Sequence, residues 1–142
     1  MNIGIACDHA GPEYKKLIKE KLIELGHDVT DYGTDTTDSV DYPDYVHPLA
    51  KDLVAGKLEK GVLICGSANG VAMTANKYQK IRAAVCWDNE LALLARQHND
   101  ANIICIPARF VSKEKAVSMV ENFMKTDFEG GRHQRRVDKI PC

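Results

Sequence analysis

Short apolar runs alternate with amphipathic segments along the whole chain. Five runs are mainly hydrophobic, the second being the weakest, and they cover residues 3–7, 28–31, 62–65, 83–86 and 103–106. Strands that are apolar on both faces are typical of a parallel sheet covered by helices on both sides. The pattern therefore predicts a sheet of five parallel strands.

Helices are predicted between and after these strands, because apolar residues recur there every three or four positions. The predicted helices cover residues 12–25, 46–54, 71–77, 91–98 and 113–125. Pro12 is suited to open the first helix and Gly26 to close it, while Ser112 is suited to cap the last one. The alternation indicates a single-domain, Rossmann-like α/β fold over residues 1–142, a three-layer α/β/α sandwich with strand order 2-1-3-4-5.

A basic segment follows the last of these helices. Gly130 and Gly131 interrupt the helical pattern, and residues 132–136 read Arg-His-Gln-Arg-Arg. The segment has too little apolar surface to form a core of its own. We expect a basic helical tail over residues 129–142 that lies on this chain, on a second copy or on a ligand.

Composition and charge exclude several classes of protein. The chain has 142 residues, of which 44% are hydrophobic, and 19 Lys+Arg against 20 Asp+Glu give a formal net charge of −1. These values allow one sizeable core and argue against disorder. A near-zero charge provides no general field for nucleic acid, so no nucleic-acid partner is expected. Without a signal-peptide pattern or an apolar stretch of about 20 residues, we expect no membrane association and a cytoplasmic location.

The cysteines do not form a disulfide framework or a metal-binding pattern. Their number is odd and none belongs to a CxxC pair; they are Cys7, Cys65, Cys86, Cys105 and Cys142. Free cysteines inside apolar runs are usually small buried hydrophobes. Cys65 differs from the others because a loop of small residues follows it.

Polar side chains follow the first and third predicted strands. In doubly wound sheets ligands bind beyond the carboxyl ends of the strands where the strand order reverses, here between strands 1 and 3. Asp8 and His9 follow the first strand, and Cys65 and Ser67 follow the third. An acid, an imidazole, a thiol and a hydroxyl would thus meet in one crevice. This combination suits an anionic substrate that needs proton transfer.

The loop after Cys65 is suited to hold an oxyanion. Gly66, Ser67, Ala68 and Gly70 are small enough for backbone N–H groups to approach a substrate closely. The helix that starts there is expected to lower the pKa of the Cys65 thiol and make it a base near neutral pH. Alternatively the loop is only a tight turn, since a glycine-rich strand-to-helix turn alone is a weak signal.

Each acid and imidazole candidate also has a purely structural interpretation. Asp8 could simply cap the first helix, whereas His9 is expected to face the crevice. His98 lies seven residues after Leu91 on the apolar face, a position where core or capping histidines are common. The polar cluster at 99–102 favours a functional role for His98.

Arginines provide candidate phosphate ligands. Arg132 and Arg136 are four residues apart, so on a helix both guanidinium groups point to one side and can bind a phosphate or carboxylate. Arg109 is a further candidate because it lies just beyond the last strand. A solvated basic tail is the alternative interpretation of 132–136.

Several other chemistries lack their required residues. A cysteine phosphatase loop needs an arginine six positions after its cysteine, where this chain has Val71 after Cys65 and Glu13 after Cys7. A response-regulator receiver needs an aspartate where Cys65 ends the third strand. The dinucleotide GxGxxG and the Walker pattern are both missing, so no nucleotide cofactor is indicated.

Six segments together resemble the ribose-5-phosphate isomerase type B family of sugar-phosphate isomerases. They are CDHAG at 7–11, DYPDY at 41–45, CGSANG at 65–70, ANK at 75–77, RQHNDAN at 96–102 and EGGRHQRR at 129–136. The resemblance implies a metal-free aldose–ketose isomerase without a cofactor. It also implies a homodimer, or a tetramer built from two dimers, in which two subunits share each active site.

The resemblance further implies a role for individual residues. Cys65 would move the proton between C1 and C2 of the sugar, and His98 would open the furanose ring with the help of Asp8. Ser67 and the backbone N–H groups of the loop would hold the cis-enediolate; the loop residues concerned are Gly66, Ala68, Asn69 and Gly70.

The remaining implied roles concern binding. Tyr42 would line the sugar pocket and Asn99 would contact the sugar. The phosphate would be bound by His9, Arg109, Arg132 and Arg136. His98, Asn99 and Arg109 would reach the site from the neighbouring subunit.

The chain departs from the family pattern at three places. Val71 stands where some members have a glutamate base, Ala68 stands where glycine is usual, and Pro107-Ala108 replaces Gly-Gly before the arginine. The implied reaction is the interconversion of D-ribose 5-phosphate and D-ribulose 5-phosphate through a cis-enediolate, in the pentose phosphate pathway. The alternatives are an isomerase of allose 6-phosphate or galactose 6-phosphate, and a sugar-phosphate sensor without activity.

Overall fold

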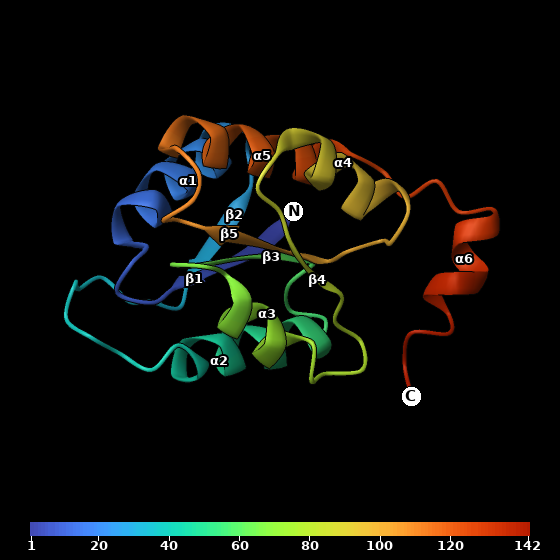
Figure 1. Ribbon diagram of the computed structural model, residues 1–142, viewed down its shortest axis with the longest axis horizontal. Helices are drawn as coiled ribbons and strands as arrows, with labels where there is room; N and C mark the ends of the chain where they lie inside the picture. The colour runs from blue at the N-terminus through green and yellow to red at the C-terminus, as the bar shows by residue number, and fades with distance from the viewer.

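The computed structural model describes residues 1–142 as an α/β sandwich. The five strands are β1 (Asn2–Cys7), β2 (Asp28–Asp31), β3 (Lys60–Cys65), β4 (Ala83–Val85) and β5 (Ile103–Pro107). The helices are α1 (Pro12–Glu24), α2 (Pro43–Val54), α3 (Asn69–Ala75), α4 (Asn89–Gln97), α5 (Lys113–Lys125) and α6 (Arg132–Val137). All strands pair in parallel, with α1, α4 and α5 on one face of the sheet and α2 and α3 on the other (Figure 1). The predicted fold class is confirmed.

The strand order is β2-β1-β3-β5-β4, so the predicted order 2-1-3-4-5 is wrong for the last two strands. β5 is buried at every position and pairs with β3 on one side and β4 on the other. β4 has three residues, all of them only half-buried. A short, partly exposed strand is suited to an edge, whereas a fully apolar strand needs a neighbour on both sides.

The core consists of two layers, one on each face of the sheet. Successive side chains of a strand point to opposite faces, so neighbours in β3 belong to different layers. Ile64 packs with the layer under α1 and α5, whose largest buried side chain is Phe123. Leu63 and Cys65 pack with the layer over α2 and α3. Cys65 therefore ends its strand on the α2–α3 side of the sheet.

Local signals place the start of α1 and the start of α5 where the sequence predicts them, whereas α2, α3 and α4 each begin two or three residues earlier than predicted. Pro12 lies in the first turn of α1, and Gly26 after that helix has a φ of 90°, in the left-handed region that favours glycine. The Ser112 hydroxyl accepts a hydrogen bond from the Lys115 N–H at 3.1 Å, which confirms the predicted cap of α5. No helix is long and apolar enough to cross a membrane.

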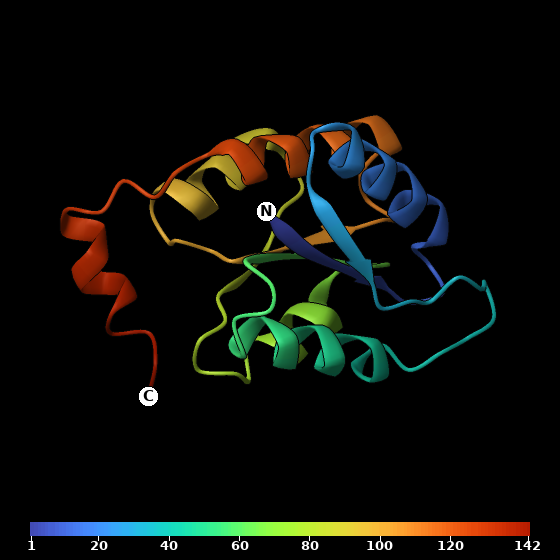
Figure 2. The same cartoon turned by 180° about the vertical axis from the view of Figure 1, so that it is seen from behind.

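The basic tail forms the predicted helix, α6, beside the end of α4 and away from the two helical layers (Figures 1 and 2). It contacts its own chain at both ends. The Glu129 N–H donates to the carbonyl of Gln97 at 3.1 Å, and the Cys142 N–H donates to Oε1 of Gln79 at 3.0 Å. Packing of residues 129–142 on a second copy or a ligand stays a prediction.

Candidate active site

A pocket of about 590 Å³ opens at the carboxyl ends of β1 and β3. The residues that line it are Asp8, His9, Val40, Asp41, Tyr42, Cys65, Gly66, Ser67, Gly70, Arg109 and Phe110. The structure thus brings together the acid, the imidazole, the thiol and the hydroxyl that were expected to meet in one crevice. The pocket lies where doubly wound sheets bind their ligands.

Asp8 forms a tight turn ahead of α1 and does not cap the helix. Its Oδ1 accepts a hydrogen bond from the Ala10 N–H at 2.9 Å. The N-cap position of α1 is Gly11, which makes no side-chain cap. The alternative interpretation of Asp8 as an ordinary helix cap is therefore wrong. The carboxyl group is 8% exposed and keeps Oδ2 without a protein donor, so this oxygen can accept a proton from a substrate.

A backbone contact fixes the protonation pattern of His9. The Val40 N–H donates to Nδ1 of His9 at 3.3 Å. Because Nδ1 accepts this bond, the neutral ring carries its proton on Nε2. His9 therefore offers an N–H donor to an anion in the pocket, and the segment leading to Tyr42 holds the ring in place.

Backbone N–H groups surround the thiol of Cys65. The N–H groups of Val71, Ala68 and Ser67 act on its sulfur as backbone donors that favour the thiolate. The loop can turn around Sγ because Ala68 has a φ of 65°, a left-handed conformation, which explains why glycine is usual there. Such a nest of N–H groups stabilises a negative charge on the thiolate or on a nearby oxygen.

The pKa of Cys65 is raised, so the expectation of a lowered pKa is wrong for this chain. Burial is the largest cause, because the side chain is 4% exposed, and the negative charge of Asp8 adds to it. The three N–H groups act in the opposite direction and are outweighed. Burial raises the pKa of Cys7 and of Cys86 to about 12. The helix start is present as expected, but its effect is smaller than that of desolvation.

The raised pKa predicts an alkaline rise in activity. If the Cys65 thiolate is the base, kcat/KM increases with pH until the thiol is fully ionised, and the higher pKa moves this rise above the range of a free thiol. A pH profile between about 6 and 10 measures it, with the rate of Cys65 alkylation as an independent titration. A flat profile, or a rise whose midpoint differs from the alkylation midpoint, would contradict the assignment.

Tyr42 and Arg109 cover the glycines of the loop. A Cβ at Gly70 would lie 2.6 Å from Cε1 of Tyr42, and a Cβ at Gly66 would lie 3.2 Å from Cζ of Arg109. Gly70 is thus required because the Tyr42 ring lies directly over it, whereas Gly66 is in close contact with the flexible Arg109 side chain. Arg109 lies beside Cys65 of its own chain, which corrects the expectation that it reaches the site from a neighbouring subunit.

Four other predicted site residues lie at the amino ends of the strands, on the side of the sheet opposite the pocket. α4 leads from the carboxyl end of β4 back to the amino end of β5, so His98 and Asn99, which follow α4, are remote from the pocket (Figure 1). α6, which carries Arg132 and Arg136, lies at the same edge (Figure 2). None of these four residues lines the pocket that contains Cys65. The single chain therefore holds two incomplete halves of the predicted site.

His98 stacks on the tail of its own chain. Its ring lies parallel to that of His133, with centroids 4.1 Å apart and an angle of 12°. Oε1 of Glu129 lies 3.6 Å from Nε2 of His98 and 3.8 Å from Nε2 of His133. Burial and the neighbouring His98 lower the pKa of His133. The tail thus fixes the orientation of the His98 ring.

His98, Glu129 and His133 are also a candidate set of metal ligands. Their ligand atoms all lie within 4.8 Å of one another. A metal binds in the plane of an imidazole ring, and two stacked parallel rings cannot both direct Nε2 at one ion. The stacked arrangement does not fit a resident metal. The predicted independence from metals and other cofactors stays a prediction.

Sequence reasoning missed three residues that line the pocket, namely Val40, Asp41 and Phe110. Asp41 and Phe110 adjoin Tyr42 and Arg109, so adjacency to predicted site residues was the available signal. Val40 carried no chemical signal, because its contribution is the backbone N–H that binds His9.

Comparison with known proteins identifies the family. The family model described as Ribose/Galactose Isomerase matches residues 3–140. The ribose-5-phosphate isomerase B of Escherichia coli is 41% identical, over 97% of this chain and 93% of that protein. The probable ribose-5-phosphate isomerase B of Mycoplasma pneumoniae is 45% identical, over 97% of this chain and 91% of that protein.

Solved structures agree with this match. The ribose 5-phosphate isomerase B of Thermotoga maritima superposes with a TM-score of 0.95 at 43% identity, covering 99% of this chain and 97% of that one. The Mycoplasma genitalium enzyme, solved with bound ribulose 5-phosphate, gives a TM-score of 0.93 at 42% identity over 98% and 93%. The chain therefore belongs to the ribose/galactose isomerase family, where its similarity is to the ribose-5-phosphate isomerases of type B.

Proposed function

We propose that this protein interconverts D-ribose 5-phosphate and D-ribulose 5-phosphate through a cis-enediolate, as a step of the pentose phosphate pathway. The observation that carries the proposal is the pocket in which three backbone N–H groups surround the Cys65 sulfur, beside Asp8, His9 and Arg109. An isomerisation of this kind needs one base, one oxyanion site and an anchor for the phosphate. The pocket offers a candidate for each.

Ring opening comes first for the aldose. His98 gives a proton to the ring oxygen O4, the bond between C1 and O4 breaks, and the anomeric hydroxyl on C1 loses its proton to Asp8. The C1–O1 bond becomes a carbonyl, so the product is the open-chain aldehyde. Asp8 and His98 lie at opposite edges of one chain, so this step uses His98 from a second copy.

Proton transfer follows on the open chain. The Cys65 thiolate takes the proton from C2, the electron pair of that bond forms the C1–C2 double bond, and O1 becomes an oxyanion. The hydroxyl proton of O2 moves to O1, C1 takes a proton from the Cys65 thiol, and a carbonyl forms at C2. The loop N–H groups and the Ser67 hydroxyl hold the enediolate oxygens, with Gly66, Ala68, Asn69 and Gly70 supplying the backbone.

Two groups of donors bind the phosphate, one from the pocket at the carboxyl ends of the strands and one from α6 of the second copy. His9 Nε2–H and the Arg109 guanidinium belong to the pocket. Arg132 and Arg136 are exposed on α6 and come from the second copy, which also supplies Asn99 to the sugar. Charge-assisted bonds of this kind keep a small flexible sugar aligned.

The assembly that follows is a homodimer, or a tetramer of two dimers, with shared active sites. A two-fold axis that places one edge of a chain over the pocket of its partner completes two sites at once. A cytoplasmic location stays a prediction.

A substrate panel tests the proposed function. We expect a higher kcat/KM for ribose 5-phosphate than for allose 6-phosphate or galactose 6-phosphate in an isomerase assay on the purified protein, without added metal. A preference for either hexose phosphate would favour the alternative isomerase activity. Binding of ribose 5-phosphate without any turnover, with or without a divalent metal, would favour a sensor and contradict the proposal.

A further inference from the structure

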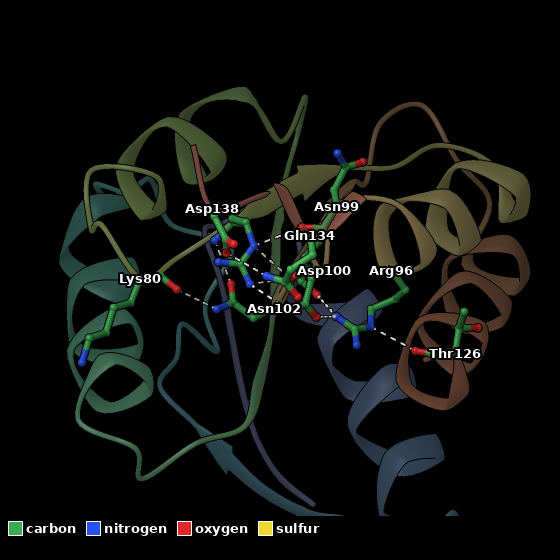
Figure 3. Close-up of polar contacts among 10 residues, drawn as sticks. Lys80, Arg96, Asn99, Asp100, Asn102, Thr126, Gln134 and Asp138 are labelled. Atoms are coloured by element: carbon green, nitrogen blue, oxygen red, sulfur yellow. Dashed lines mark hydrogen bonds and ion pairs between the residues drawn. The ribbon is translucent and has the colours of Figure 1, made fainter. Parts of the chain in front are cut away.

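Two arginines enclose the turn that carries His98 and Asn99. Arg96, in the last turn of α4, is 7% exposed. Its Nη1 donates to Oδ1 of Asp100 at 2.9 Å and to the carbonyl of Ala101 at 2.6 Å, and its Nε donates to the carbonyl of Thr126 at 3.0 Å (Figure 3). The guanidinium also lies 5.8 Å from the centre of the Phe123 ring. These contacts tie the exit of α4 to the turn at Asp100 and to the end of α5.

Arg82 approaches the same turn from the segment before β4. Its Nε donates to the carbonyl of Asn99 at 3.0 Å, and its Nη2 donates to the carbonyl and Oδ2 of Asp100 at 2.8 and 3.3 Å. Asn102 fixes Arg82 in turn, because its Oδ1 accepts the Arg82 N–H at 2.8 Å. The Asp100 carboxylate is therefore held by one arginine on each oxygen.

The turn contains a left-handed residue, and its Asn99 side chain is free. Asp100 has a φ of 47°, a left-handed conformation that aspartate adopts more readily than most residues with a side chain. The Asn99 side chain points away from the arginines (Figure 3) and makes no hydrogen bond within the chain. A left-handed residue is a common end for a helix, but a connection between a helix and a strand does not need two guanidinium groups. This much order is explained if the turn must present His98 and Asn99 in one orientation.

We propose that Arg82 is a positioning residue for the ring-opening step, acting through Asp100 together with Arg96 to hold the backbone of His98 and Asn99. The inference rests on the proposed function, because it assigns ring opening to His98. Arg82 itself touches no substrate in this account. A small displacement of a catalytic side chain lowers the rate substantially, since proton transfer requires alignment.

Rates measured in the two directions of the reaction distinguish a positioning role of Arg82 from a general structural role. Ribose 5-phosphate is mainly a closed furanose and must be opened. Ribulose 5-phosphate cannot close to a furanose, because its C5 oxygen carries the phosphate. Removal of its C1 proton by Cys65 therefore needs the pocket and the phosphate ligands but no ring opening.

The test is Arg82→Met, which keeps the length of the side chain and removes its donors. We expect kcat for ribose 5-phosphate to fall about tenfold or more, while consumption of ribulose 5-phosphate and deuterium uptake at its C1 in D₂O change less than about twofold. Arg82→Lys, which keeps a charged donor, should recover part of the loss. Lys16→Met is the matched control, because Lys16 is exposed on α1 and makes no ion pair, and both rates should stay unchanged.

Equal losses in both assays would overturn the proposal, because Arg82 would then support the fold or the assembly as a whole. Unchanged rates in both assays would overturn it as well. If Arg82→Met does not fold, Asp100→Asn tests the same contact, since asparagine tolerates a left-handed φ and lacks the charge; the same split is expected. A wild-type protein inactive in both assays would contradict the proposed function itself.

Discussion

Cys65→Ala should lower kcat for ribose 5-phosphate by about 10²- to 10⁴-fold, the usual contribution of one general base. The loss corresponds to about 3 to 5 kcal/mol of transition-state stabilisation. Alanine removes the only thiol to which the N–H groups of Ser67, Ala68 and Val71 are directed. The loop keeps its small residues, so substrate binding should persist.

Steady-state kinetics and a binding isotherm with ribose 5-phosphate measure the two effects separately. Thermal unfolding confirms that the variant is folded, because loss of one buried sulfur costs only about 1 kcal/mol. The matched control is Cys142→Ala, which removes an exposed thiol far from the pocket and should leave kcat unchanged. Retention of more than about a tenth of wild-type kcat by Cys65→Ala would exclude the thiol as the base.

His98→Asn should lower kcat for ribose 5-phosphate by about 10²-fold or more, because asparagine cannot transfer a proton to the ring oxygen. Deuterium uptake by ribulose 5-phosphate should be far less affected. The comparison is necessary because His98 also stacks on His133 at 4.1 Å, and loss of this contact could displace the tail. His133→Asn serves as the control for stacking alone. Equal losses in both assays would contradict a role of His98 in ring opening.

The sequence was sufficient for the fold class because each buried strand is a continuous apolar run. The order of the last two strands could not be predicted from such runs. An apolar run shows that a segment is a strand, but it does not show which strands lie on either side of it. The available signal was that the apolar segment at residues 83–85 is short and lies beside polar residues, as an edge strand allows; its half-burial is visible only in the structure.

For Arg109, the position relative to its strand was a better guide to the site than the family resemblance. Arg109 follows β5, so topology alone placed it at the carboxyl edge, where the structure has it beside Gly66. His98 follows a helix that returns to the amino edge, and the same reasoning would have separated it from Cys65. The raised pKa of Cys65 was missed because a helix start can be seen in a sequence, whereas the extent of burial cannot.

A site that two copies share explains why the site residues lie at both the carboxyl and the amino ends of the strands. Mixing the inactive variants Cys65→Ala and His98→Asn tests this directly. In a hybrid dimer one site carries both substitutions and the other carries neither. Random exchange of subunits makes about half of the dimers hybrids, so about a quarter of wild-type activity should return.

The matched control is a mixture of Cys65→Ala with Asp8→Asn. Both residues line the same pocket of one chain, so every site in that hybrid retains one substitution and no activity should return. Recovery of about a quarter of wild-type kcat with ribose 5-phosphate in the first mixture, and none in the second, is the predicted result. No recovery in the first mixture, after hybrid dimers have been demonstrated, would contradict the shared active site.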